Sequence, residues 1–396
     1  MFESYLQIDV QDYISKCASE SIEKIAFQKN PFPTLDKVFL MQQIVGKQKA
    51  QHKLPTWFAT QNIIYPTKLS IEQTSSEITA EYKASLIEKG TLCDLSGGFG
   101  VDSFYFSKRC KQVVHCEWQQ ELSNIVAHNN EVLRVDNIEC KSGNSFDILS
   151  EYEYFDYLYI DPARRSNTQE KIVLLEDCEP NVIDLMDFYF SKTTTILIKT
   201  SPLLDLKAGI QSLKNVAEIH VVAVQNEVKE LLWLLKKDYI GEINIITKNF
   251  KKDEIKTFGF QMNEIKEPIN YSLPKKYLFE PNAAIMKSGG FEALASDFEL
   301  LKLHPNSHLF TADIFMDFCG RVFVIEHSFL YQKKEMKSYI ENQKMNVTTR
   351  NFPETVAQIK KKWKIKDGGE TYCFFTTNLD GEKIVLLCKK ITNENK

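Results

Sequence analysis

Residues 91–118, TLCDLSGGFGVDSFYFSKRCKQVVHCEW, contain the pattern that decides the fold. A short apolar run, Thr91–Leu95, is followed by the turn Ser96–Gly100, which has three glycines in five residues. Apolar residues at helical spacing then lead to a second apolar run, which ends on an acid, Glu117. The order strand, glycine turn, helix, strand and acid is typical of half of a nucleotide-binding α/β unit.

Each part of this pattern has a chemical reason. Glycines such as Gly98 and Gly100 allow a tight turn with positive φ and let the backbone approach a ligand closely. The carboxylate of Glu117, at the end of the second strand, can accept hydrogen bonds from a ribose hydroxyl pair. Asp94, at the end of the first strand, can reach a cationic or amino group of the same ligand. We therefore expect these four residues to bind a cofactor.

The glycine pattern distinguishes between two cofactors. The dinucleotide fingerprint of NAD enzymes requires a third glycine at position 103, where the chain has Ser103. The methyltransferase form, acid-x-Gly-x-Gly-x-Gly, is matched at Asp94, Gly98 and Gly100, with Ser96 in place of the first glycine. The stretch thus resembles motif I of class I methyltransferases that depend on S-adenosylmethionine (AdoMet). A glycine turn in another kind of α/β protein is the alternative.

Length and charge suggest several domains. A chain of 396 residues predicts two to four domains, at ~150 residues each. Residues 331–396 hold 14 Lys and Arg and 8 Asp and Glu, a balance of +6, so the rest of the chain carries −4 − 6 = −10. A basic C-terminal part on an acidic body indicates either an anionic partner or simply a solvated basic face.

Composition also bounds the compartment and the chemistry. The nine cysteines include no Cys-x-x-Cys pair, which argues against a disulfide framework or a zinc site, and the seven histidines lack metal-ligand spacing. The N-terminus has no signal-peptide pattern, and no apolar run approaches the ~18 residues of a membrane span. We therefore expect a cytoplasmic protein with no metal and no membrane association.

Secondary-structure patterns divide the chain into four parts. Residues 1–70 predict a helical N-terminal domain. Residues 71–250 alternate strands and helices, which predicts an α/β fold with a mostly parallel, Rossmann-like sheet. Residues 251–325 form a mixed connector. Residues 326–396 predict a small α+β domain, one helix of which carries five lysines between positions 360 and 366.

A second chemical signal follows the predicted fourth strand. Asp161, Pro162 and Arg164 lie at the carboxyl edge of the sheet, where open α/β sheets bind ligands, and resemble motif IV of nucleic-acid methyltransferases. Asp161 would position the acceptor, and Pro162 would fix its direction. Arg164 replaces the usual aromatic residue and would suit a phosphate or carboxylate. An ordinary strand-ending turn is the alternative. No cysteine follows the fifth strand, around Lys199, so methylation of a uracil carbon is not expected.

Three further residues are weaker candidates for the cofactor site. Asn144 follows the third strand and could bind the adenine amino group. Gln73 and Ser76 lie near a helix that a capping-box pattern, Thr74 to Glu77, predicts to begin there. They could reach the cofactor or serve only to cap the helix.

The whole chain resembles bacterial class I methyltransferases that carry a C-terminal THUMP-like domain. The matching stretches are 53–57 (KLPTW), 72–77 (EQTSSE), 94–102 (DLSGGFGVD), 161–165 (DPARR), 280–283 (EPNA), 350–353 (RNFP) and 366–369 (KDGG). The resemblance implies that residues 251–325 are ferredoxin-like and that residues 326–396 are a THUMP-like RNA-binding domain. It implies AdoMet as cofactor and a structured RNA, such as tRNA or rRNA, as substrate. The alternative is an RNA-binding protein of this fold with weak or no catalysis.

Overall fold

The structure is a computed structural model that describes residues 2–164, 175–252, 254–264 and 268–391. The chain divides into two compact units, Met1–Ala217 with Leu231–Gly241, and Glu218–Glu230 with Glu242–Lys396. Across these described ranges, no helix is long and apolar enough to cross a membrane, and no group of three His, Cys, Asp or Glu side chains could hold a metal ion.

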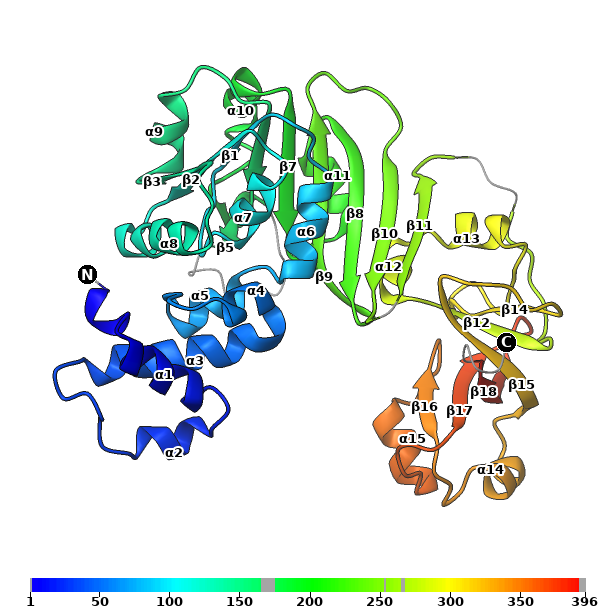
Figure 1. Cartoon of the computed structure of the whole chain (residues 1–396). Coiled ribbons are helices and arrows are strands. Elements are labelled where there is room, and N and C mark those ends of the chain that lie inside the picture. The colour runs from blue at the N-terminus through cyan, green and yellow to red at the C-terminus, as the bar shows by residue number, and fades with distance from the viewer. Residues whose placement is uncertain (1, 165–174, 253, 265–267, 392–396) are drawn as a thin grey trace. The chain divides into compact units, whose positions relative to one another are not determined.

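The predicted helical N-terminal region is confirmed. Its helices, drawn in blue in Figure 1, are α1 (Ile8–Cys17), α2 (Ile22–Ala26), α3 (Lys37–Lys53), α4 (Pro55–Ala59) and α5 (Lys68–Gln73), which begins at the end of this region. Helix α6 (Glu77–Ser85) follows, in the part predicted as the α/β domain. The Asp36 side chain begins α3 by accepting hydrogen bonds from the backbone N–H groups of Val38 and Phe39. Apolar residues of α1, α2 and α3, among them Ile14 and Ile44, form a small core of their own.

The predicted parallel sheet is also confirmed. Among the described residues, nine strands form one sheet in the order β11-β10-β8-β9-β7-β4-β1-β2-β3. Their bounds are β1 (Thr91–Asp94), β2 (Gln112–Glu117), β3 (Ile138–Ser142), β4 (Tyr157–Ile160), β7 (Thr195–Thr200), β8 (Val216–Val224), β9 (Glu227–Lys236), β10 (Asn244–Phe250) and β11 (Ile255–Gln261). Strands β3, β2, β1, β4 and β7 run parallel to one another, whereas β9 runs antiparallel to β7.

Strand β9 explains an ambiguous stretch of sequence. Residues 229–237 read equally well as helix or strand, because six successive residues, 230–235, are buried and leave no alternation. A strand covered on both faces loses the period of two that identifies strands with one solvent face. Trp233 from this strand is fully buried and donates a hydrogen bond from Nε1 to Thr200 Oγ1 at 2.9 Å.

Helices connect the strands of the sheet in the first unit (Figure 1). They are α7 (Val101–Ser107), α8 (Gln120–Val132), α9 (Ser145–Ser150), α10 (Met186–Lys192) and α11 (Leu206–Ser212). Helix α8 buries Leu122, Ile125 and Val126, which recur at helical spacing and pack this helix onto its neighbours. Two short strands after β4, β5 (Ala163–Arg164) and β6 (Cys178–Glu179), pair antiparallel to each other.

The C-terminal part of the second unit is a separate sheet with helices. Seven strands of the described chain have the order β13-β14-β12-β15-β18-β17-β16. Its elements are β12 (Tyr277–Pro281), α12 (Ala283–Ser288), α13 (Phe291–Asp297), β13 (Leu301–Lys302), β14 (Phe310–Ala312), β15 (Gly320–Leu330), α14 (Lys333–Tyr339), β16 (Asn346–Thr349), α15 (Val356–Trp363), β17 (Thr371–Thr377) and β18 (Lys383–Lys390). The predicted small α+β folds at the C-terminus are therefore confirmed.

A buried carboxylate connects three parts of this sheet through hydrogen bonds. Glu280, on β12, is only 3% exposed. Its Oε2 accepts a hydrogen bond from Arg321 Nε on β15 at 2.6 Å, and its Oε1 accepts one from Arg350, which follows β16, at 3.0 Å. Charge-assisted hydrogen bonds of this kind are about twice as strong as neutral ones.

We predict that Glu280→Gln lowers the free energy of unfolding of the second unit by about 1–3 kcal/mol, because the buried amide weakens both bonds to arginine. Glu326→Gln is the matched control. Glu326 pairs with the exposed Lys389 on the same sheet, and we expect it to change stability by less than about 1 kcal/mol. Urea denaturation of the full chain measures both, and equal effects would contradict the assigned role of Glu280.

Candidate active site

The glycine turn between β1 and α7 has the backbone geometry that the sequence predicts. Gly98 and Gly100 have φ values of +55° and +75°, in the left-handed region that L side chains rarely adopt. A Cβ on Gly100 would also lie 2.6 Å from Val126 Cγ1, so helix α8 packs directly against the turn. A Cβ on Gly98 would meet only the Ser96 carbonyl oxygen, at 3.8 Å, so space is open on that side.

Glu117 faces this turn from the end of β2. The Gly98 backbone N–H donates to Glu117 Oε2 at 3.0 Å, and the Gln119 N–H donates to Oε1 at 2.7 Å. Burial raises the pKa of Glu117, and backbone N–H donors from Gln119, Gly98 and Trp118 partly offset that effect. The structure therefore brings together Gly98 and Glu117, two of the predicted cofactor-binding residues.

Asp94 lies deeper than the sequence suggested. It is only 1% exposed, and both of its carboxylate oxygens accept hydrogen bonds from serines of the same loop and helix. Ser96 donates from its backbone N–H to Oδ1 at 3.0 Å, and Ser103 donates from Oγ to Oδ2 at 2.6 Å. Burial raises the pKa of Asp94 to about 7. This geometry fits a residue that braces the turn, and contact with a cofactor stays a prediction.

Ser96 connects the glycine turn to the second predicted motif. Its hydroxyl accepts a hydrogen bond from the Asp161 backbone N–H at 2.6 Å and donates to Asp94 Oδ1 at 3.3 Å. A glycine at position 96 would make neither bond. The serine that departs from the methyltransferase pattern thus fixes the loop after β4 to the loop after β1.

Asp161 forms an ion pair that the sequence did not reveal. Lys199 Nζ donates to Asp161 Oδ2 at 2.5 Å. The two residues emerge side by side because Ile160 on β4 is in register with Ile198 on the parallel strand β7. The only available signal was a lysine near the end of the otherwise apolar strand TILIKT.

The other residues of the second motif are described only in part. The backbone of Ala163 and Arg164 forms β5, where Arg164 is in register with Cys178. The structure places Pro162 directly between Asp161 and this short strand. The phosphate or carboxylate contact predicted for Arg164 stays a prediction, and Arg165 lies outside the described residues.

Asn144, the predicted adenine contact, is the N-cap of α9. Its Oδ1 accepts a hydrogen bond from the Phe146 backbone N–H at 2.9 Å. The neighbouring Gly143 N–H donates to the Glu117 carbonyl at 3.1 Å, which places this loop beside the end of β2. Asn144 therefore lies at the same edge as Glu117, and its contact with a ligand stays a prediction.

The predicted capping box at Thr74 is wrong. Ser76 is the N-cap of α6, and its Oγ accepts a hydrogen bond from the Thr79 backbone N–H at 3.3 Å. The Glu77 carboxylate instead accepts hydrogen bonds from the Thr56 backbone N–H and from the Tyr105 hydroxyl. These long-range bonds satisfy the Glu77 carboxylate better than the local cap would. Gln73, the last residue of α5, is exposed. No described contact brings Gln73 or Ser76 to the glycine turn, and their cofactor role stays a prediction.

Two residues near the site were missed by sequence reasoning. Lys199 is one. The other is Trp118, whose side chain is 79% exposed although it follows the buried Glu117 directly. A large exposed ring beside a buried carboxylate offers a flat apolar surface to a ligand. The Glu-Trp pair at the end of β2 was the signal that could have found it.

Comparisons with known proteins cover both units. A family model described as a ferredoxin-like domain matches residues 277–318, and one described as THUMP domain-like matches residues 320–390. The solved structure of a candidate methyltransferase from Porphyromonas gingivalis W83 is 31% identical, covers 98% of this chain and 99% of that chain, and has a TM-score of 0.88. A search of curated proteins found no match.

Two further solved structures are similar over a smaller part. A methyltransferase from Geobacter sulfurreducens is 13% identical over 40% of this chain and 77% of its own, with a TM-score of 0.30. An rRNA methylase from Streptococcus thermophilus is 12% identical over 40% of this chain and 94% of its own, with a TM-score of 0.31. The Porphyromonas protein matches nearly the whole chain, whereas these two match less than half of it.

We predict that Asp94→Asn gains stability relative to the wild type as pH rises from 5 to 8. The folded pKa of Asp94, about 7, exceeds the unfolded value of about 3.9, so the folded protein binds the extra proton in this window. Its stability therefore falls as pH rises through the folded pKa, by up to about 1.4 kcal/mol per pH unit, and the asparagine lacks this dependence.

Guanidinium denaturation at pH 5, 6, 7 and 8 measures this difference. Asp147→Asn, at an exposed position on α9, is the control, and its difference from the wild type should change little with pH. A difference for Asp94→Asn that stays constant over the range would refute the assigned burial of a protonated carboxyl group.

Proposed function

The chain belongs to the family of bacterial class I methyltransferases with a C-terminal THUMP-like domain, and on this premise we propose that it methylates structured RNA with AdoMet as the methyl donor. The observation that carries the proposal is the Glu117 carboxylate, which is held against Gly98 at the carboxyl edge of the sheet. Open α/β sheets bind nucleotides at this edge. Residues 71–250 would form the catalytic domain and residues 326–396 the RNA-binding domain.

The residues at this edge fit a nucleoside. A carboxylate has about four lone-pair sites, so Glu117 can keep its hydrogen bonds from the Gly98 and Gln119 backbone and still accept from a ribose hydroxyl. The open space beside Gly98 lets a ligand approach the turn, and the Trp118 ring can cover an adenine. Asn144 lies at the adjoining strand end, where the adenine amino group would come. This set supports AdoMet as the cofactor.

Methyl transfer from AdoMet requires the protein mainly to position the acceptor and to remove its proton. AdoMet supplies a methyl group that is already activated on a sulfonium. The residues of the chain then have to hold the acceptor in line with that methyl group and take its proton. Asp161 suits this task, because the Ser96 hydroxyl fixes its backbone beside the glycine turn.

A second candidate function is RNA binding without efficient methyl transfer. The residue two places after Pro162 is Arg164, so the motif lacks the aromatic side chain that stacks on a flipped base. Binding of AdoMet without transfer to any RNA pool would favour this second function.

The THUMP-like region offers lysines to RNA. Helix α15 and the turn after it carry five, and two of these are already paired, Lys360 with Asp367 and Lys362 with Glu354. The other three are exposed, and within the described chain they have no ion-pair partner: Lys361, Lys364 and Lys366. Phosphate contacts by such lysines supply affinity without reading sequence.

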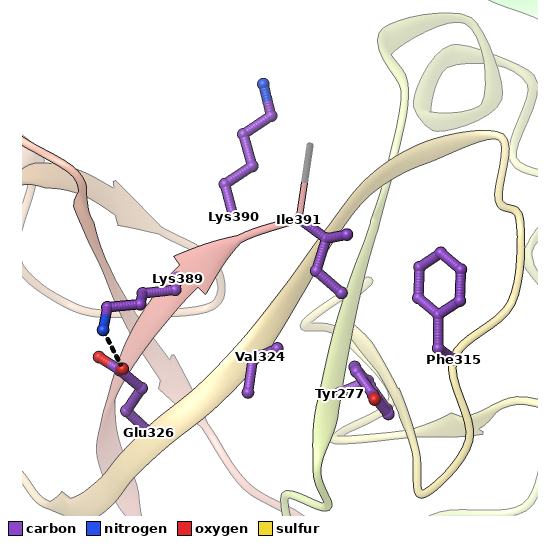
Figure 2. A pocket seen from close by; sticks show the side chains of 7 residues that line it. All are labelled: Tyr277, Phe315, Val324, Glu326, Lys389, Lys390 and Ile391. Carbon is purple, nitrogen blue, oxygen red and sulfur yellow. Dashed lines mark ion pairs between the residues drawn. The ribbon is translucent and has the colours of Figure 1, made fainter. Parts of the chain in front are cut away.

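A hollow of about 410 Å³ in the second unit adds aromatic surface. Figure 2 shows Tyr277 and Phe315 on one side of it and the ion pair between Lys389 and Glu326 on the other. The two rings meet edge to face with centroids 6.1 Å apart. Unpaired bases of RNA stack on such rings, and Lys390 at the rim can meet a phosphate. We include this hollow among the proposed RNA contacts.

We predict that Glu117→Ala weakens AdoMet binding at least about tenfold, because the ribose hydroxyls lose a charged acceptor. Isothermal titration calorimetry of the full chain measures the affinity. Glu121→Ala, an exposed carboxylate in the first turn of α8, is the control and should bind as the wild type does. A wild type that does not bind AdoMet, or a Glu117→Ala variant that binds it equally well, would overturn the proposed cofactor site.

We predict that the double variant Lys361→Glu, Lys364→Glu weakens RNA binding at least about tenfold and makes it less sensitive to salt. Each lost phosphate contact lowers the slope of log affinity against log salt by roughly 0.7–0.9. Fluorescence anisotropy with a labelled tRNA pool at several salt concentrations measures both. The control with the same net charge is Lys111→Glu, Lys214→Glu, two exposed lysines of the first unit.

The same assay tests the hollow. Phe315→Ala should weaken binding by about 1–3 kcal/mol if a base stacks there, and its affinity change should depend little on salt. Tyr154→Ala, at an exposed ring of the first unit, is the control. If each test variant matches its control, neither the lysines of the THUMP-like region nor the hollow binds RNA.

A further inference from the structure

The ion pair between Lys199 and Asp161 stands where the methyl acceptor has to be held. Lys199 Nζ lies 2.5 Å from Asp161 Oδ2, and the two side chains are 17% and 31% exposed. Both side chains are therefore largely sheltered but still partly accessible to a bound substrate. The hydrogen bond from the Asp161 N–H to the Ser96 hydroxyl, at 2.6 Å, holds the pair next to the glycine turn.

We propose that this pair selects a hydroxyl oxygen, the ribose 2′-hydroxyl of RNA, as the methyl acceptor, and that Lys199 is a catalytic residue. The inference rests on the proposed methyltransferase function. A ribose 2′-hydroxyl is both a hydrogen-bond donor and an acceptor. The pair offers one carboxylate acceptor and one ammonium donor within 2.5 Å of each other, so both groups can act on a single oxygen atom.

An exocyclic amino group fits the pair poorly. The amino groups of adenine and cytosine present only donors, so the Lys199 ammonium could not donate a hydrogen bond to the acceptor nitrogen itself. Their nitrogen also becomes positive as the methyl group arrives, and a neighbouring ammonium would repel that charge. The sequence also has Arg164 at the position of the motif where enzymes that methylate such amines carry a stacking aromatic residue.

The pair also suits the course of the reaction. The O–C bond forms as the C–S bond breaks, and the sulfur keeps the electron pair of the broken bond and becomes a thioether. The hydroxyl proton passes to the Asp161 carboxylate and from there to water. Lys199 stabilises the negative charge that develops on the oxygen while its proton is leaving. In the overall reaction, a hydroxyl group and a methylsulfonium are converted to a methyl ether, a thioether and a proton.

The first test identifies the acceptor atom with the wild-type chain alone. RNA from a bacterial pool is incubated with the full chain and with AdoMet labelled on its methyl group, and it is then digested to nucleosides. Tandem mass spectrometry separates the base from the ribose of each labelled nucleoside. We expect the label on the ribose fragment, and we expect a DNA copy of the labelled RNA to accept none.

The second test addresses Lys199 itself. Lys199→Met removes the ammonium at nearly constant length, and we expect it to lower kcat at least about 100-fold while the Kd for AdoMet changes less than about twofold. Lys199→Arg keeps a cationic donor and should recover part of that loss. Lys207→Met, at an exposed lysine on α11, is the control and should act as the wild type does.

The outcomes separate this inference from the function on which it rests. Label on the base fragment leaves the proposed methyltransferase function intact and overturns the hydroxyl acceptor. A Lys199→Met variant that binds AdoMet and keeps the wild-type kcat overturns the catalytic role of Lys199. A wild type that transfers no methyl group to any RNA overturns the proposed function, and the inference falls with it.

Discussion

The hydrogen bond between the Ser96 hydroxyl and the Asp161 backbone N–H holds together the two loops on which the candidate site depends. The same hydroxyl donates to Asp94, whose second oxygen accepts from Ser103 on α7. One continuous chain of bonds therefore runs from α7, through the end of β1, to the end of β4. Without the hydroxyl, partly buried polar groups would lose their partners, at a cost of about 1–3 kcal/mol each.

A buried network supports the same edge from the helices. Lys83 on α6 is fully buried, and its Nζ lies 3.2 Å from Asp102 Oδ1 on α7 and 2.9 Å from Ser75 Oγ. Asp102 Oδ2 accepts a hydrogen bond from Tyr159 OH on β4 at 2.8 Å. A buried ion pair adds little net stability, but removal of one partner strands a charge at a cost of about 3–5 kcal/mol. The network thus favours one placement of α6 and α7 against the strand that ends at Asp161.

The fold could be predicted from the sequence because the patterns that indicate it are local. The glycine turn, the alternation of strands and helices, and the acid that ends β2 can each be recognised within about thirty residues. The pairing of Lys199 with Asp161 could not be, because it requires that β4 and β7 be neighbours in register although 38 residues separate the two side chains. Asn144 and Ser76 were predicted from their residue type and place in the chain. In this structure their side chains cap helices, which the sequence pattern did not reveal for Asn144, and a ligand contact by either residue stays a prediction.

Charge explains how the proposed tasks can be divided between the two ends of the chain. The ion pair at the sheet edge is neutral, and residues 1–330 carry −10 against +6 for residues 331–396, so the catalytic part has no net attraction for a polyanion. Exposed charges act over only about 8–10 Å at physiological salt, so RNA affinity has to come from cations in direct contact. Two of the five lysines of α15 and its following turn are neutralised by Glu354 and Asp367, which leaves few such contacts. Because those lysines would supply the affinity, Lys199 at the edge of the sheet can act on the acceptor oxygen rather than on a phosphate.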